Sequence, residues 1–197
     1  MAVISKAEVG HKLVYQDLST FDVPASFRGK SKLLVQLWWI VQGTLFSMSP
    51  QVFYGWRVLL LRFFGAQIGK GVKIRSSVKI TYPWNLEIGN HCWVGDDTSI
   101  YNLGNVRIGN HVAIAHKVYI NTGGHAYDKI TFDIFSKPVY IEDECWITND
   151  VYIAPGTTIG KGTIVSARSS VLKNLPAGKI CVGTPAVPIK DRTISDR

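Results

Sequence analysis

Cysteine is scarce in this sequence. Its 197 residues include only Cys92, Cys145 and Cys181, and no two of them have the short spacing of metal ligands. The odd count and the wide spacing exclude a disulfide framework and favour a reducing compartment. We therefore expect a cytoplasmic protein whose cysteines fill the core and which needs no metal.

Long apolar runs are also missing. The most extended one, residues 33–46, is interrupted by two glutamines and a glycine, and it falls short of the roughly 20 residues that cross a bilayer. Residues 1–10 lack the apolar segment of a secretory signal peptide. The sequence thus predicts neither a membrane span nor export.

Acidic residues are the minority among the charges. Lys and Arg number 22 against 14 Asp and Glu, and the resulting formal net charge of +8 favours an anionic partner. The cations are scattered, and no stacking motif of a nucleic-acid-binding domain accompanies them. We therefore expect no nucleic acid, and a phosphate-rich cofactor or an acidic lipid is the better match to the charge.

What the sequence has in abundance is a six-residue repeat. Ile or Val recurs at every sixth position in four runs, and the last run continues for six repeats. The spacing persists across Gly-Asn, Gly-Asp and Pro-Gly pairs, where the hairpins of an ordinary sheet would reset it. The positions are Ile68, Ile74 and Ile80; Ile88, Val94 and Ile100; Ile108, Ile114 and Ile120; and Ile141, Ile147, Ile153, Ile159, Val165 and Val171.

The fifth position of each hexad supports the same repeat. Nearly all of its residues are small or β-branched: Val72, Val78, Cys92, Thr98, Val112, Val118, Cys145, Val151, Thr157, Thr163, Ser169 and Leu175. Three six-residue strands make one triangular coil, in which an aliphatic residue points inward from each side and a small one fits near each corner. The sequence therefore predicts an all-β solenoid, a parallel β-helix.

The repeat is interrupted once at length. Between Ile120 and Ile141 lies an insertion near residues 121–138, which contains two glycines followed by His125. An insertion into a solenoid forms a loop on one face, which is often the binding face. We divide the chain into an N-terminal arm and helical cap (1–66), the β-helix catalytic domain (67–176) and a closing tail (177–197).

The segment before the repeat reads as helical. Residues 28–44 are rich in Leu, Val and Trp and predict one helix. Ser49 and Pro50 read as the N-cap and first residue of a second helix, which should run to about Phe64 and stop at Gly65.

The sequence resembles the bacterial hexapeptide-repeat O-acetyltransferases, in particular the branch of colanic acid and other exopolysaccharide biosynthesis. The resemblance covers roughly residues 15–192. It is carried by YNLG at 101–104, TGGHAY at 122–127, KPVYIED at 137–143, IAPGTTIG at 153–160 and VGTPA at 182–186. It implies a left-handed β-helix, a homotrimer with active sites between subunits, and transfer of an acetyl group from acetyl-CoA to a sugar hydroxyl of a surface polysaccharide precursor.

The same resemblance implies that His125 is the general base. A sugar hydroxyl is a poor nucleophile and must lose its proton as it attacks a thioester, and a neutral imidazole has a suitable pKa and reach. Asn102 resembles an asparagine that holds the acceptor or the oxyanion in related sugar acetyltransferases, although corner turns also use Asn. Tyr127 and Asp128 follow His125 closely, so we expect them to bind the acceptor or simply to be polar loop residues.

Coenzyme A needs a groove for its pantetheine and cations for its phosphates. By position, four residues match the family's cofactor contacts: Trp146, Asn149, Ala167 and Lys173. The family often has a basic residue directly after the closing Pro-Ala, where this chain has Val187. We therefore expect Lys190 or Arg192, and also Arg168, to supply further positive charge.

The N-terminal segment allows two interpretations. Arg28, Lys30 and Lys32 precede an apolar stretch with Trp38 and Trp39, as in a helix that lies at a membrane interface. Such a helix would make peripheral contact with the inner face of the membrane, where a lipid-linked acceptor would lie. We prefer the second interpretation, in which the helices cover the open end of the β-helix and bury the same residues.

Two other functions fit the fold. A zinc enzyme like the γ-carbonic anhydrases would need three converging histidines from among His91, His111, His116 and His125. A β-helix without catalytic activity would need none of the residues singled out above. The closing Gly-Thr-Pro-Ala element and the basic tail favour coenzyme A over both.

Overall fold

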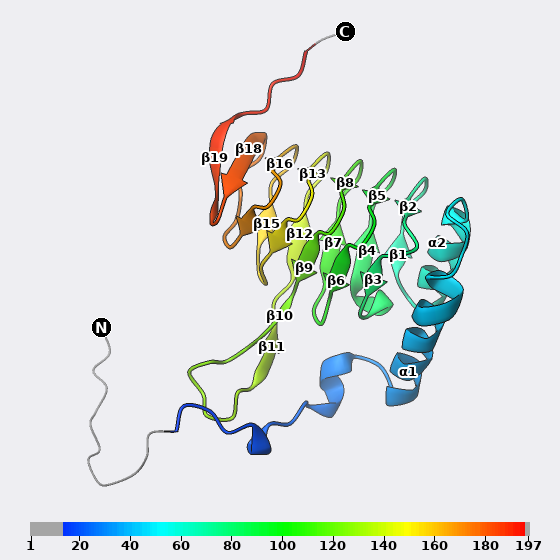
Figure 1. Cartoon of the computed structure of the whole chain (residues 1–197), viewed down its shortest axis with the longest axis vertical. Coiled ribbons are helices and arrows are strands. Elements are labelled where there is room, and N and C mark those ends of the chain that lie inside the picture. The colour runs from blue at the N-terminus through cyan, green and yellow to red at the C-terminus, as the bar shows by residue number, and fades with distance from the viewer. Residues whose placement is uncertain (1–13, 196–197) are drawn as a thin grey trace, which may run out of the picture.

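A computed structural model describes residues 14–195. It is a solenoid of triangular coils with helices packed on one end and a hairpin on the other (Figure 1). The fold is the parallel β-helix that the repeat predicts, with the left hand that the family resemblance implies. Between residues 14 and 195, no helix has the length and apolar character needed to pass through a bilayer.

Three parallel sheets form the sides of the prism. Sheet A contains β1 (Gln67–Ile68), β4 (Leu86–Ile88), β7 (Val106–Ile108), β12 (Val139–Ile141) and β15 (Thr158–Ile159). Sheet B contains β2 (Lys73–Ile74), β5 (Trp93–Val94), β8 (Ala113–Ile114), β13 (Trp146–Ile147), β16 (Ile164–Val165), β18 (Lys179–Gly183) and β19 (Ala186–Asp191). Sheet C contains β3 (Lys79–Ile80), β6 (Ser99–Tyr101), β9 (Tyr119–Asn121), β14 (Tyr152–Ile153) and β17 (Ser170–Val171).

The aliphatic position of the hexad forms the core. Within sheet A, Ile88 pairs with Ile108, Ile108 with Ile141, and Ile141 with Ile159, so equivalent residues stack directly above one another. These side chains are buried along the whole prism. Each coil therefore buries the apolar face of its neighbour, which no single coil could do alone.

The fifth position lies at the corners and serves the backbone. The hydroxyl of Thr98 donates to the Ala115 carbonyl (2.9 Å), and the Thr163 hydroxyl donates to the Pro176 carbonyl (2.6 Å). Both side chains are buried, so these hydrogen bonds satisfy polar groups that water cannot reach. The three cysteines are free and buried as well, and burial raises the pKa of Cys145 to about 11. Its thiol is therefore a core group and not a nucleophile.

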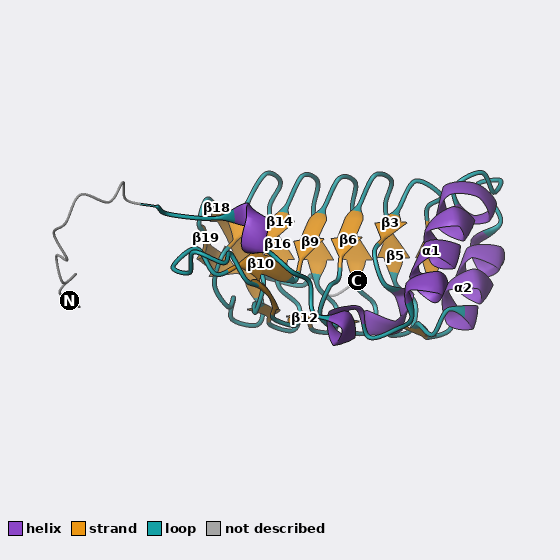
Figure 2. Cartoon of the chain, turned by 90° about the horizontal axis from the view of Figure 1, so that it is seen from below, coloured by secondary structure: helices purple, strands orange, loops and turns teal. Residues whose placement is uncertain are grey.

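The cap, which we define as residues 32–64, closes the first coil. It consists of α1 (Lys32–Val41), the π-helix η3 (Gln42–Phe46) and α2 (Tyr54–Phe63), which lie across one end of the prism (Figure 2). Cap side chains bond the exposed backbone of all three first-coil strands. Arg62 donates to the Ile68 carbonyl (2.6 Å), Arg57 to that of Ile74 (2.6 Å) and Trp38 to that of Ile80 (2.8 Å). The preferred interpretation, that the helices cover the open end, agrees with these bonds.

The helix boundaries differ from the prediction. The first helix begins at Lys32, with the Ser31 hydroxyl as N-cap, and not at Arg28. The second helix begins at Tyr54 and not at Pro50. The buried Arg57 guanidinium donates hydrogen bonds to the Ser49 hydroxyl and the Pro50 carbonyl, and these bonds hold the segment before Tyr54 in a non-helical conformation. The helix does end at Phe63, and Gly65 follows with a φ of +95°.

The remaining short elements connect these parts. The 3₁₀ turns η1 (Leu18–Thr20) and η2 (Ala25–Arg28) belong to the arm before the cap, and η4 (Pro83–Asn85) lies at a corner of the first coils. Residues 1–13 of the expected arm fall outside the described part. At the far end, β18 pairs in parallel with β16 and turns back through antiparallel β19, which closes the prism.

Candidate active site

The insertion after Asn121 forms a hairpin that projects from the corner between sheets C and A (Figure 1). Its strands are β10 (Gly123–His125) and β11 (Ile134–Ser136), with His125 paired to Ile134. Two glycines let its base pack closely. A Cβ on Gly123 would lie 2.5 Å from Leu103 Cδ1, and one on Gly124 would lie 2.6 Å from Phe135 Cζ. These contacts hold the base of the hairpin against the coil, and they therefore fix the position of the His125 backbone.

His125 is held by the loop of its own hairpin. Its Nδ1 lies 2.8 Å from the Phe132 carbonyl oxygen, and its ring stacks on the Phe132 ring with centroids 4.2 Å apart and planes 7° apart. A carbonyl oxygen can only accept, so Nδ1 carries the proton. In the neutral imidazole, Nε2 then has the free lone pair that a general base requires. Phe132 adopts a φ of +52°, a backbone conformation that non-glycine residues rarely adopt.

The N-terminal arm covers the same histidine. Phe21 lies with its ring centroid 5.4 Å from that of His125, and the Asp17 amide donates to the Ile130 carbonyl (2.8 Å). Further along the arm, the Trp84 indole donates to the Arg28 carbonyl (2.9 Å). Sequence reasoning missed both Phe21 and Phe132, because neither stands in a motif or a periodic position that would signal contact with His125.

The two loop residues expected at the acceptor stand away from the coils. Tyr127 is 89 % exposed at the hairpin tip, and Asp128 beside it is exposed. A neighbouring ion pair, Lys129 to Asp133 (2.9 Å), holds the tip together. Both predicted acceptor residues are therefore accessible, but the structure gives neither a contact with His125.

Asn102 has a different position from the one expected. Its side chain is completely buried, its Oδ1 accepts from the Tyr82 amide (2.9 Å), and its Nδ2 donates to the Tyr82 carbonyl (2.6 Å). Both the oxygen and the nitrogen of the amide thus bond the neighbouring coil, and the side chain has no surface exposed to a substrate within the chain. This placement makes Asn102 a corner residue, the alternative that its position in the repeat allowed, and we leave it out of the site.

Sheet B bears an aromatic groove. Trp146 pairs with Ala113, which pairs with Trp93, so a small residue lies between two exposed indoles. The hollow around them has a volume of about 860 Å³ and is also lined by Lys73, Arg75 and Arg192. An apolar floor with cations along its rim suits a ligand that has both an apolar arm and phosphates. Trp146 is one of the residues predicted to contact the cofactor, whereas Trp93 is not.

Three more predicted cofactor residues lie together on the corner between sheets B and C. Asn149 accepts at its backbone carbonyl from the Arg168 amide (3.0 Å), and Ala167 precedes Arg168 on an exposed turn. Arg168 Nε lies 3.9 Å from Asp150, and its side chain is largely exposed. The Asn149 Oδ1 accepts from the amide of His116 (3.2 Å), which lines the aromatic groove, so this corner adjoins the groove.

The predicted phosphate cations are dispersed. Lys173 is exposed on the corner that follows sheet C, and Lys190 is exposed on β19, paired with Ile180. Arg192 donates to the carbonyls of Glu144 (2.8 Å) and Gly162 (2.9 Å), so it ties the tail to two corners. The structure therefore separates Lys173 from the other cofactor candidates within one chain.

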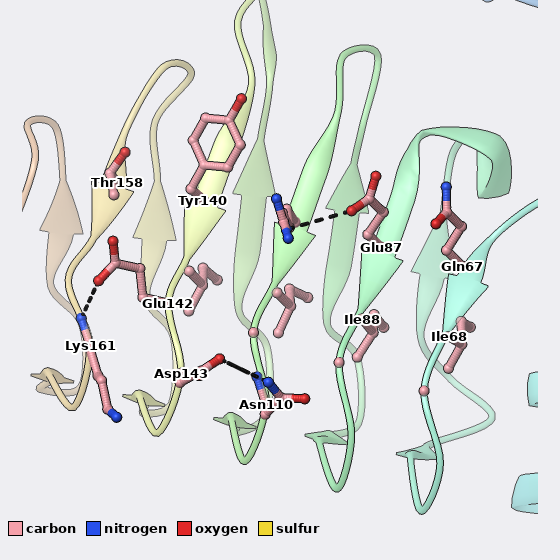
Figure 3. Close-up of a pocket in the computed structure, with 16 residues that line it drawn as sticks. Gln67, Ile68, Glu87, Ile88, Asn110, Tyr140, Glu142, Asp143, Thr158 and Lys161 are labelled. Atoms are coloured by element: carbon pink, nitrogen blue, oxygen red, sulfur yellow. Dashed lines mark hydrogen bonds and ion pairs between the residues drawn. The ribbon is translucent and has the colours of Figure 1, made fainter.

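Sheet A carries a second hollow of about 860 Å³, shown in Figure 3. Its polar groups bind one another: Arg107 pairs with Glu87 (3.6 Å), the Lys161 amide donates to Glu142 (2.7 Å), and the Asn110 amide donates to Asp143 (2.6 Å). Because these groups are already paired, we find no catalytic arrangement on this face.

His91, His111, His116 and His125 do not converge on one point. His91 and His111 stack on the corner between sheets A and B, with centroids 5.2 Å apart. His116 lies on the corner between B and C, where its Nδ1 accepts from the Asp96 amide (3.0 Å). Among residues 14–195 no three His, Cys, Asp or Glu side chains come together as a metal site would require.

Comparison with known proteins gives close relatives. The chain is 55 % identical to the colanic acid biosynthesis acetyltransferase WcaF of Escherichia coli strain K12 over 177 residues. This aligned region covers 90 % of this chain and 97 % of that protein. A solved maltose O-acetyltransferase of Clostridium difficile 630 superposes with a TM-score of 0.76 at 26 % identity, over 86 % of this chain and 96 % of its own. A galactoside acetyltransferase solved with coenzyme A has the same fold, with a TM-score of 0.74 at 23 % identity over 87 % and 92 % of the two chains. No protein-family model matches the chain.

Proposed function

Because the chain belongs to the hexapeptide-repeat acetyltransferases of the colanic acid biosynthesis type, we propose that it moves an acetyl group from acetyl-CoA to a sugar hydroxyl of a surface or exopolysaccharide precursor. The observation that carries the catalytic part of this proposal is the hydrogen bond from His125 Nδ1 to the Phe132 carbonyl. It fixes the tautomer in which Nε2 can accept a proton.

The reaction then follows from ordinary acyl-transfer chemistry. Nε2 of His125 takes the proton of the acceptor hydroxyl as that oxygen attacks the thioester carbonyl. The carbon–sulfur bond of the thioester breaks, the sugar ester forms, and the imidazolium returns its proton to the departing thiolate. The Phe132 carbonyl stabilises the imidazolium meanwhile, because it accepts from the Nδ1–H of the charged ring.

The donor site is proposed on sheet B and its neighbouring corner. Trp146 and Ala167 would border the pantetheine arm, and Asn149 and Arg168 would lie beside it. Lys173 and Lys190 would meet the phosphates. Because Trp146 lies on sheet B and Lys173 on the corner that follows sheet C, the role of Lys173 needs a neighbouring subunit that brings the two together.

A homotrimer supplies that neighbour. Sheet B exposes Trp93 and Trp146, and sheet C carries a ladder of the exposed Tyr101 and Tyr119 and the half-buried Tyr152, with centroids 6.4 Å and 6.1 Å apart. Outward positions of sheet A are polar in most coils, as Figure 3 illustrates with Gln67 and Glu87. Packing of sheet B on one subunit against sheet C of the next covers both aromatic faces, and three such contacts close a ring.

The function is tested by mass spectrometry of the host's surface polysaccharide with and without this protein. The proposal expects one O-acetyl group to disappear when the protein is removed. A purified sample should also release coenzyme A from acetyl-CoA in the presence of the acceptor and contain no stoichiometric zinc. Zinc with carbonate hydration would instead establish the metalloenzyme, and neither activity would leave a structural β-helix.

The trimer is tested by sedimentation velocity. Wild-type protein should sediment as a trimer at micromolar concentration, and Tyr119→Glu, on the ladder of sheet C, should shift it towards monomer. Arg107→Glu on sheet A changes charge on the polar face and should leave the trimer intact. A monomeric wild type would refute this arrangement.

A further inference from the structure

The cap has an apolar face that the solenoid does not use. Val35, Trp38, Val58 and Leu61 are buried against the first coils. The opposite side, which we call the outer face, exposes large apolar side chains from α1, η3, the following loop and α2. They are Leu33, Leu37, Trp39, Ile40, Leu45, Met48, Val52, Phe53, Trp56, Leu59 and Phe63.

Helical spacing makes this face continuous. Leu33, Leu37 and Ile40 recur at four and three residues along α1, and Trp56, Leu59 and Phe63 recur at three and four residues along α2, so each set forms one stripe. Val52, in the turn before α2, extends the second set. A hollow lined by Leu45, Met48, Phe53 and Trp56 connects η3 with α2. A contiguous exposed apolar patch of this kind marks an interaction site, and here the outer face has no protein cover among residues 14–195.

The charge around the outer face has one sign. Residues 23–86 contain nine Lys and Arg and no Asp or Glu, whereas carboxylates occur in most later coils. Six of these cations are exposed: Lys30 and Lys32 lie before and at the start of α1, Arg62 lies in α2, and Lys70, Lys73 and Lys79 lie in the first coil, which the cap covers. An apolar face on a cap whose charged residues, Lys32, Arg57 and Arg62, are all cationic complements a surface that is apolar inside and anionic at its edge.

We propose that the outer face docks on a lipid bilayer with anionic headgroups. The two helices lie across the end of the solenoid, so docking places them in the plane of the interface with the prism standing away from it (Figures 1 and 2). Trp39 and Trp56, each partly exposed, lie where interfacial indoles are favourable. In the trimer proposed above, a ring of parallel prisms would turn all three caps the same way, and three docking faces would strengthen the contact.

The test is co-sedimentation of the whole protein with vesicles of phosphatidylcholine, with or without about 30 % phosphatidylglycerol. We expect binding to the anionic vesicles, weaker binding to the neutral ones, and release of most protein between about 0.1 M and 1 M salt. The double variant Leu33→Gln/Phe63→Gln should bind the anionic vesicles at least about tenfold less. Both side chains are about four-fifths exposed (81 % and 80 %), so the variant should keep its melting temperature.

Matched variants separate this inference from the proposed reaction. Ile194→Gln removes an equally exposed side chain (82 %) at the other end of the molecule and should bind like wild type. His125→Ala should bind vesicles normally whether or not it transfers acetyl groups. Equal binding to neutral and anionic vesicles, or no binding to either, would overturn the inference. So would a change in oligomeric state of the Leu33→Gln/Phe63→Gln variant, because the outer face would then be an interface between copies of this chain.

Discussion

Removing the imidazole of His125 should abolish most activity while the fold persists. Loss of a general base lowers kcat by about 10²–10⁴-fold, which corresponds to about 3–5 kcal/mol of transition-state stabilisation. The structural loss is smaller: one hydrogen bond to Phe132, worth about 1 kcal/mol, and one ring stack, worth about 0.5–1.5 kcal/mol. Both lie in the hairpin, outside the stacked aliphatic core, so the solenoid should remain folded.

Two further variants distinguish the base from the packing. His125→Asn keeps a side-chain donor near the Phe132 carbonyl but has no basic nitrogen, so we expect the same loss of activity as in His125→Ala. Phe132→Ala keeps the carbonyl and removes the stacked ring, and it should lose only about tenfold because the imidazole is less well held. The assay is acetyl transfer to the acceptor under saturating acetyl-CoA, together with the melting temperature of each variant. Folded His125→Ala protein with activity within about threefold of wild type would refute the role of His125.

Three other changes follow from the structure. Lys173→Glu should weaken acetyl-CoA binding at low salt and leave acceptor affinity nearly unchanged, whereas the control Lys70→Glu, on a distant corner, should alter neither. If calorimetry shows the same cofactor affinity for wild type and both variants, Lys173 is only a solvated surface residue. Arg57→Met should lower the free energy of unfolding by about 2–4 kcal/mol, because the carbonyls of Ile74, Pro50 and Gln51 lose their buried donor; a denaturant midpoint equal to that of wild type would contradict this. Partial burial would raise the pKa of Asp96, but hydrogen bonds from Arg75 and Ser77 and the charge of Arg75 outweigh it and lower the pKa. The ionised Asp96 carboxylate therefore contributes its full share to the free energy of unfolding above the pKa of an unfolded Asp, which is about 4, and this contribution is lost as the pH falls through the lower folded pKa. The difference in melting temperature between wild type and Asp96→Asn should accordingly shrink below about pH 4. A difference that is the same at about pH 3 and pH 7 would disprove it.

The sequence by itself determined the scaffold. A six-residue period with an aliphatic residue at one position and a small residue at another fits only a stack of triangular coils, because each side and corner imposes its own size limit. The break between Ile120 and Ile141 likewise had to leave the prism, and it forms the hairpin that carries His125. These features are local and periodic, so they can be read without knowing which coils meet.

The tertiary structure alone decided what the side chains of the site can do. Asn102 is recognisable in a motif. Only the stacking of coils shows that its side-chain amide is bonded at both ends to the backbone of Tyr82, twenty residues earlier. The proton on His125 is placed by a carbonyl seven residues later, and the ring of Phe21 reaches it from an arm without pattern. The cap shows the same limit: both of its helices carry large apolar residues on the side that packs on the prism and on the opposite side, so periodicity could not tell which side the prism covers.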